Sequence, residues 1–106
     1  MAIFEVDESD FDEIRSQELD KGNFIVVKFG SELCDACQAL DFELEELEEV
    51  ENISILELES GDSEELFESF GIQRVPTLII YNPKEEMILR HEGVMLYQDI
   101  LEIINK

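Results

Sequence analysis

The sequence predicts an α/β fold in which helices cover both faces of a mixed sheet. Segments with strand-like and helix-like periodicity alternate along the chain in the order βαβαβαββα, without a repeat or a linker. The length of 106 residues suits one domain, and the 44% of hydrophobic residues can fill a single core. Alternation of this kind is typical of helices packed on a sheet.

The first half of the chain contains a short strand, a helix and a central strand. Residues 3–6 (IFEV) alternate between apolar and polar positions, as a short strand does. The following helix is expected to take Asp10 as its N-cap, with Glu13 three residues later completing a capping-box pattern. Residues 23–29 (NFIVVKF) form a nearly continuous apolar run, which predicts a strand buried on both faces and interrupted only by Lys28.

An acidic amphipathic helix is expected next, with the two cysteines in its first turn. Its apolar face recurs at three- and four-residue steps, at Cys34, Cys37, Leu40, Leu44 and Leu47. Positions 41–51 hold seven acids, and like charges four residues apart weaken a helix modestly.

The second half adds three strands and two helices. Strands are expected at residues 53–59, 77–81 and 87–93, and a closing helix at 96–106. The intervening helix is expected to be capped by Asp62 or Ser63 and to end at Gly71. Its buried face consists of Leu66, Phe67 and Phe70.

The charge balance argues against two classes of function. Twenty-eight acidic and seven basic residues give a net charge of −21, which repels nucleic acid phosphates and anionic lipids. No apolar run is long enough to cross a bilayer, so we expect a soluble, cytoplasmic protein. The acids either form a solvated surface or dock a partner with a basic face.

The chain's two cysteines, Cys34 and Cys37, lie in the stretch CDAC at a helix start. A disulfide across so short a loop restrains the unfolded chain little, so a purely structural role is improbable. The unpaired N–H groups of a helix N-terminus favour a thiolate, which is the reactive form of cysteine. The spacing is therefore informative, and it is typical of a working dithiol or of half a metal site.

These features together resemble the thioredoxin family over essentially the whole chain, residues 1–106. The resemblance rests on CDAC after a buried strand, RVPT at residues 74–77 before the next strand, and Gly93 after a hairpin. It implies the thioredoxin fold, a central mixed sheet of about five strands flanked by four helices in one domain. It also implies a cis peptide bond before Pro76, close to the dithiol.

The resemblance further implies the roles of individual residues. Cys34 is the expected nucleophile and Cys37 the resolving thiol, together reducing protein disulfides with electrons from a reductase-type donor. The expected substrate-binding residues are Leu33, Asp35, Ala36, Arg74, Val75, Pro76 and Gly93. No bound cofactor beyond the redox-active disulfide is expected, and the protein is expected to be a monomer that binds neither nucleic acid nor membrane.

The motif departs from the family pattern in ways that change its expected chemistry. Leu33 replaces the family's tryptophan before the first cysteine, and Gln38 stands where lysine is common. Asp35 places a negative charge beside Cys34, which should raise the pKa of that thiol. We therefore expect a range of partners different from that of typical members.

Lys28 occupies the position where the family buries an aspartate behind the second cysteine, as its proton acceptor. If the two residues missing here fall near residues 51–53, the family's neighbouring lysine corresponds to Glu57, and the pair is retained with reversed polarity. The resemblance then implies catalytic roles for both residues, with Glu57, or Lys28 in its neutral form, accepting the proton of Cys37. A buried lysine alone would be costly, whereas a paired one is tolerable. The alternative is that the Lys28 side chain extends to the protein surface and that Glu57 is solvated.

Three other functions compete with the oxidoreductase. A zinc site within one chain would have only His91 to add to the two cysteines, and we assign His91 no role. A metal or cluster bridging two subunits through paired motifs is the second. The third is a binding or redox-sensing module of the same fold with an acidic docking surface.

Overall fold

The computed structural model describes residues 3–106, and its elements follow the predicted order. The strands are β1 (Ile3–Glu5), β2 (Phe24–Gly30), β3 (Ile53–Glu59), β4 (Thr77–Tyr81) and β5 (Met87–Glu92). The helices are α1 (Phe11–Asp20), α2 (Asp35–Glu45), α3 (Glu64–Ser69) and α4 (Tyr97–Ile104). Within these residues, no helix combines the length and apolar character needed to traverse a bilayer.

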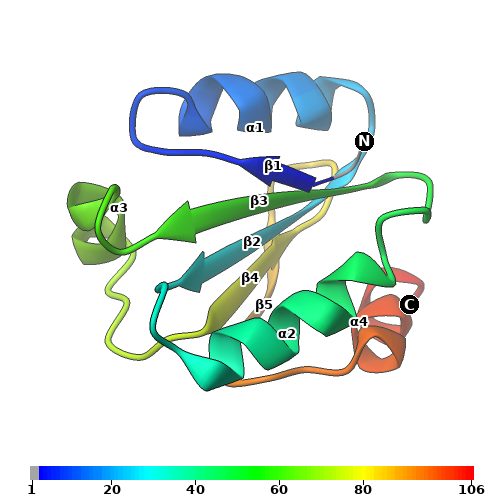
Figure 1. The fold of residues 1–106 in the computed structure, drawn as a ribbon. Helices are drawn as coiled ribbons and strands as arrows, with labels where there is room; N and C mark the ends of the chain where they lie inside the picture. The colour runs from blue at the N-terminus through cyan, green and yellow to red at the C-terminus, as the bar shows by residue number, and fades with distance from the viewer. Residues whose placement is uncertain (1–2) are drawn as a thin grey trace.

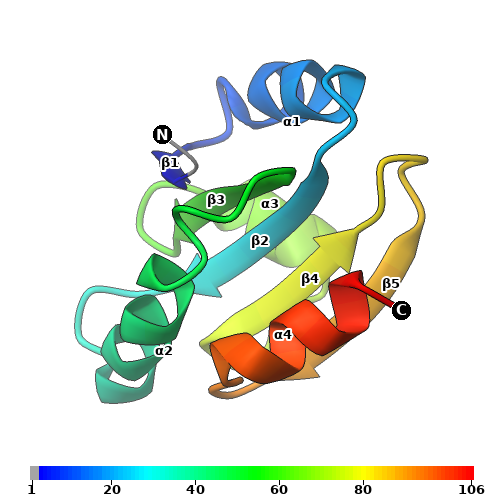
Figure 2. The same cartoon turned by 90° about the vertical axis from the view of Figure 1, so that its right-hand side faces the viewer.

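Strand β2 lies at the centre of a five-stranded mixed sheet with the order β1-β3-β2-β4-β5. It runs parallel to β3 and antiparallel to β4. Helices α1 and α3 cover one face of the sheet, and α2 and α4 cover the other (Figures 1 and 2). The predicted α/β architecture is therefore confirmed.

The core consists of two apolar layers, one on each face of the sheet. Alternate residues of β2 point to opposite faces, so Ile25, Val27 and Phe29 enter one layer and Val26 the other. The layer under α2 and α4 also contains Leu40, Leu44, Leu47 and Ile100. The same alternation directs Lys28 toward α2, on the face of Val26.

Two predicted N-cap residues occupy the N-cap positions but make no capping hydrogen bond. Asp10 occupies the N-cap position of α1, but its Oδ1 accepts a hydrogen bond from the Asp7 N–H at 2.8 Å, on the preceding turn. Ser63, one of the two predicted residues, is the N-cap residue of α3, but its side chain makes no capping hydrogen bond. Oε1 of Glu8, distant in sequence, accepts hydrogen bonds from the N–H groups of Glu65 and Leu66 instead. Its negative charge at this helix start also suits the helix dipole.

Helix α2 ends at Glu45, and the chain continues through tighter turns in which the Glu46, Leu47 and Glu48 N–H groups bond three residues back. The last turn of α2 contains no basic residue. Acidic side chains at a helix C-terminus oppose the helix dipole and repel one another, which accounts for the early end.

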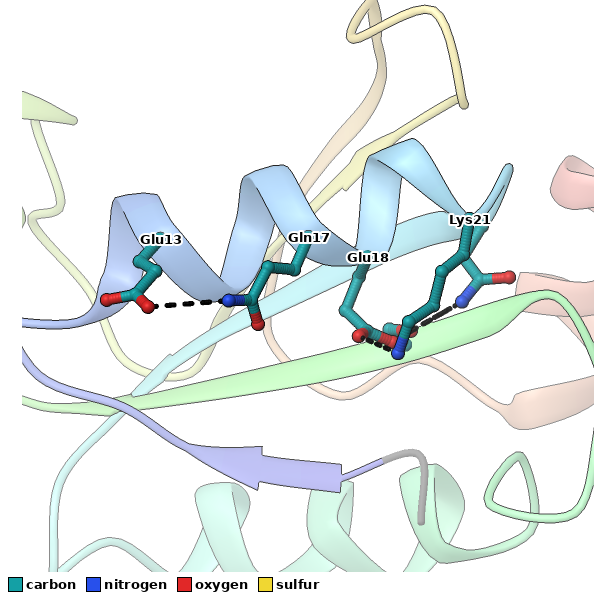
Figure 3. A network of polar contacts seen from close by, with 6 residues as sticks. Glu13, Gln17, Glu18 and Lys21 are labelled. Carbon is teal, nitrogen blue, oxygen red and sulfur yellow. Dashed lines mark hydrogen bonds and ion pairs between the residues drawn. The ribbon is translucent and has the colours of Figure 1, made fainter.

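A buried carboxylate ties α1 to the sheet. Glu18 is 6% exposed, and its oxygens accept hydrogen bonds from Ser54 Oγ at 2.7 Å, Lys21 Nζ at 2.7 Å and Asn23 Nδ2 at 3.3 Å (Figure 3). Burial raises the pKa of Glu18, but these hydrogen bonds and the Lys21 charge outweigh burial and hold that pKa below its ordinary value.

We expect Glu18→Gln to lower the free energy of unfolding at neutral pH by about 1–3 kcal/mol, because hydrogen bonds to a charged group are lost. A depressed folded-state pKa gives stability that is present above the ordinary pKa and lost as the pH falls through the folded value. The deficit, measured by urea denaturation, should therefore shrink at roughly pH 3. Glu13→Gln is the control, because Glu13 is exposed and bonds only Gln17 in Figure 3. An equal deficit at both pH values would contradict the prediction.

Candidate active site

The two cysteines occupy different environments at the start of α2. Cys34 is the N-cap residue and is partly exposed, whereas Cys37 lies in the first turn and is 1% exposed. They form a disulfide with a Cα–Cα distance of 5.2 Å, and Cys34 Sγ accepts a hydrogen bond from the Cys37 N–H at 3.1 Å. Only the first sulfur can meet another protein, and the helix N–H groups stabilise negative charge on it.

The loop before β4 lies against this disulfide. The Val75–Pro76 peptide bond is cis, as the sequence resemblance implied. The carbonyl oxygen of Val75 is 3.9 Å from Cys34 Sγ, and the Gly93 N–H donates to the Pro76 carbonyl at 2.8 Å. Gly93 has φ +98°, a conformation that favours glycine. The fold thus brings the cis Val75–Pro76 bond beside Cys34 and ties Gly93 to Pro76.

The remaining predicted substrate-binding residues are exposed. Leu33, which replaces the family's tryptophan, is 100% exposed and offers an apolar contact directly before Cys34. Asp35 and Ala36 are exposed on the first turn of α2. The Arg74 side chain is also exposed, while its carbonyl accepts a hydrogen bond from the Thr77 hydroxyl.

Lys28 is buried behind the dithiol. Its side chain is 5% exposed, and its Nζ donates a hydrogen bond to Oδ1 of Asp41, with which it forms an ion pair. A methyl group built on Gly30 would lie 2.8 Å from Lys28 Cε and 3.5 Å from Cys37 Sγ. The absence of a side chain at Gly30 therefore leaves space for the lysine between this strand and the buried sulfur.

The structure places Glu57 directly opposite Lys28 in the β2–β3 register, while the ion pair of Lys28 is made with Asp41. Sequence reasoning missed Asp41, which it considered only as one of the acids of the helix. A signal was present, because Asp41 follows Cys37 by four residues and so lies on the same helix face. The Lys28 side chain therefore does not extend to the protein surface, and a carboxylate from α2 binds it.

Glu57 is half-buried, and burial raises its pKa to about 7. The Lys28 charge lowers this pKa, whereas Asp41, through its charge and a hydrogen bond between the two carboxyl groups, and Glu5 raise it. A cleft of about 330 Å³ beside Glu57 is lined by further acids, namely Glu5, Asp7, Glu32, Glu59 and Asp62. The site therefore holds one buried cation among several carboxylates.

The zinc alternative finds no support in the described part of the chain. Over residues 3–106, no cluster of three or more histidine, cysteine or acidic side chains has the arrangement of a metal site. His91 lies on β5, with its Nε2 3.3 Å from the Val94 carbonyl oxygen.

A cis-proline loop packed on a disulfide at a helix start, within this fold, defines a thioredoxin-type domain. The thioredoxin family model matches residues 2–106, and the chain belongs to the thioredoxin family. The two cysteines form the CxxC disulfide of this domain, which is consistent with thiol–disulfide oxidoreductase chemistry.

Solved structures show the same fold at low sequence identity. Chloroplastic thioredoxin z is 21% identical with a TM-score of 0.83, and the match covers 99% of this chain and 93% of that one. A mutant thioredoxin from Halobacterium salinarum is 19% identical with a TM-score of 0.82, covering 97% and 88%. Reduced Schistosoma mansoni thioredoxin is 20% identical with a TM-score of 0.83, covering 99% and 97%. Comparison with curated proteins returns no match.

We expect Asp35→Asn to increase the rate of alkylation of reduced Cys34 by about twofold at neutral pH, because removing the adjacent negative charge favours the thiolate. Iodoacetamide labelling followed by peptide mass spectrometry measures this rate. Glu45→Gln is the control, because it removes the same charge from an exposed position at the other end of α2. A rate equal to that of the control would contradict the prediction.

Proposed function

We propose that this protein reduces disulfide bonds of other proteins through Cys34 and Cys37. The observation that carries the proposal is the placement of a partly exposed sulfur at a helix N-terminus, beside cis-Pro76 and in front of a buried second sulfur. An exposed, stabilised thiolate is the attacking species in thiol–disulfide exchange. A second thiol held within reach completes the exchange.

The exchange proceeds in two steps. The Cys34 thiolate attacks one sulfur of the target disulfide, forms a mixed disulfide and releases the other target sulfur as a thiolate. Cys37 then loses its proton and attacks Cys34 Sγ, so that the bond to the target breaks and its second sulfur leaves. Two electrons pass to the target, which becomes a dithiol, and the Cys34–Cys37 disulfide forms.

Target binding is proposed to combine backbone pairing with an apolar contact. An extended segment of the target would lie along Val75, with Leu33, Ala36 and Gly93 around the attacked sulfur. Arg74 and Asp35 add one charge of each sign near this edge. Backbone recognition depends little on sequence, which suits an enzyme that acts on several proteins.

In the cell, a reductase-type donor would return the disulfide to the dithiol, and a reducing, cytoplasmic compartment would keep the dithiol reduced. The working unit is proposed to be a monomer, because each chain carries both sulfurs of the site.

We expect the protein to reduce insulin disulfides with dithiothreitol as the electron donor, and expect both Cys34→Ser and Cys37→Ser to abolish this turnover. Cys37→Ser should accumulate a mixed disulfide with the target at Cys34, because the second step is blocked. Turbidity of precipitating insulin chains measures turnover, and mass spectrometry identifies the adduct. Activity that survives either substitution would refute the proposal.

The second candidate function is a docking module, favoured by the acids that line the cleft behind the dithiol. A docking module would give little turnover, and its complex with a basic partner would weaken as salt screens the charges. The insulin assay therefore separates the two functions.

We expect Lys28→Met to lower the reduction potential of the dithiol, because an ammonium beside the sulfurs favours the thiolate and hence the reduced form. The fall should be on the order of 30 mV, which corresponds to a tenfold change in the equilibrium of a two-electron couple. Redox titration against glutathione measures the potential. Lys84→Met, an exposed lysine in the turn between β4 and β5, is the control. An unchanged or higher potential would refute the role of Lys28.

A further inference from the structure

The segment between α3 and β4 brings Val75 to the dithiol, and α3 sets where this segment begins. In Figure 1 it is the yellow-green coil that leaves α3 and reaches the start of β4 close to α2. Helix α3 has six residues, none of them buried, and its first N–H groups bond Glu8 of a distant loop. The helix therefore depends on other elements for its position.

Arg90, on β5, bonds the point where the segment leaves α3. Its Nη1 donates a hydrogen bond to the Phe70 carbonyl at 2.7 Å, and its Nη2 donates one to the Gly71 carbonyl at 3.0 Å. The last carbonyl groups of a helix lack partners within the helix and carry the negative end of its dipole. A guanidinium suits both carbonyls, because it is cationic and presents its donors as a planar fork.

Packing and hydrogen bonding divide the work at this point. The Phe70 ring lies against the Phe29 ring, with 5.2 Å between the ring centroids, and this contact anchors the end of the helix. Gly71 has φ +66°, a backbone conformation that commonly ends a helix. Because the chain turns at Gly71, the Arg90 bonds fix the direction in which the segment continues.

The region of β5 also holds the other end of the segment. Gly93, directly after β5, donates its N–H to the Pro76 carbonyl at 2.8 Å. Arg90 and Gly93 therefore hold residues 71 and 76 from two points of the chain only three residues apart. Between these points, the Val75 carbonyl oxygen lies 3.9 Å from Cys34 Sγ. A segment fixed at both ends needs less ordering when a target pairs with it.

The Arg90 bonds go to carbonyl oxygens although acids are abundant. The chain has 28 acidic residues, and Glu92 follows two positions later, on the same face of β5. Over residues 3–106, the ion pairs found involve Arg15, Lys21 and Lys28 and do not include Arg90. The guanidinium is therefore directed to the end of α3 rather than to a neighbouring carboxylate.

We propose that Arg90 positions residues 71–76 for target binding and so sets the affinity of the protein for disulfides in other proteins. The inference rests on the proposed function, because only disulfide exchange gives this segment a target. Arg90 is a positioning residue, since it acts through the carbonyls of Phe70 and Gly71. A small disulfide, which has no peptide backbone to pair with Val75, should react independently of Arg90.

The experiment compares a protein target with a small disulfide. Reduced protein is mixed with excess insulin in a quenched-flow instrument, and alkylation followed by mass spectrometry gives the fraction in which the Cys34–Cys37 disulfide has formed. The half-saturating insulin concentration reports binding, and the plateau rate reports the sulfur chemistry. The rate with Ellman's reagent, a small aromatic disulfide, is measured in parallel.

We expect Arg90→Gln to raise the half-saturating insulin concentration by about threefold to tenfold, because the segment must then be ordered during binding. The plateau rate and the rate with Ellman's reagent should stay within about twofold of those of the unmodified protein. Hydrogen exchange followed by mass spectrometry should show faster exchange at the amides of residues 71–75, because this part of the chain opens more easily without the Arg90 bonds.

Two control variants separate positioning from charge and from stability. Lys84→Gln removes the same charge from an exposed site in the turn between β4 and β5. Glu8→Ala removes the hydrogen bonds at the other end of α3, so it should lower stability in urea. Both should leave the half-saturating insulin concentration unchanged. If Arg90→Gln fails to fold by circular dichroism, Arg90→Lys replaces it with the same expectation, because lysine keeps the charge without the planar fork.

Four outcomes would overturn the role of Arg90. They are an unchanged half-saturating concentration in the folded Arg90 variant, unchanged exchange at residues 71–75, an equal loss of rate with Ellman's reagent, and an equal shift in Lys84→Gln or Glu8→Ala.

Failure of this inference is distinguishable from failure of the proposed function. If insulin oxidises the unmodified protein through both cysteines while the Arg90 variant behaves identically, the role of Arg90 is wrong and the oxidoreductase stands. If insulin does not oxidise the unmodified protein, the proposed function fails and the role of Arg90 fails with it.

Discussion

The burial of β2 on both faces is the constraint on which the rest of the structure depends. The strand lies between β3 and β4 and under helices on both sides, so each of its side chains must be apolar or fully partnered. Lys28 is the one ionisable residue in this strand. Its charge requires a carboxylate from a neighbouring element, and α2 supplies Asp41. The same helix carries the dithiol, so the partner of the charge and the reactive sulfurs lie on one element.

Reversed polarity behind the dithiol changes which group can act as a base. A buried carboxylate can take a proton directly, whereas an ammonium can only pass one on. The carboxylates nearest to Lys28 lie on β3 and α2. Gly30 permits this arrangement, because any side chain there would occupy the space of the lysine. A lysine on β2 is thus accommodated by a glycine that leaves space for it and by an acid that pairs with its charge.

Local pattern predicted most of the fold and part of the site. The runs ISILELE and TLIIY correspond to β3 and β4 residue for residue, because continuous apolar segments have few alternatives once buried. The N-cap positions of α1 and α3 were right, but the expected capping hydrogen bonds are absent. At α3, Glu8 accepts the helix N–H groups instead, and it reaches them only after the chain has folded. Asp41 was missed for the same reason. Its spacing from Cys37 is local, but its partner lies on a strand thirteen residues earlier, and tertiary structure decides which acid meets the lysine.

The acidity of the chain acts within the site as well as on the surface. A net charge of −21 spread over a small domain makes each further carboxylate harder to ionise, most of all where burial already opposes charge. Glu57 and Glu59 both show this effect, with pKa values raised first by burial and then by neighbouring acids. Exposed acids, by contrast, are screened by water and ions. The excess of carboxylates therefore favours the protonated form of the half-buried Glu57 near neutral pH.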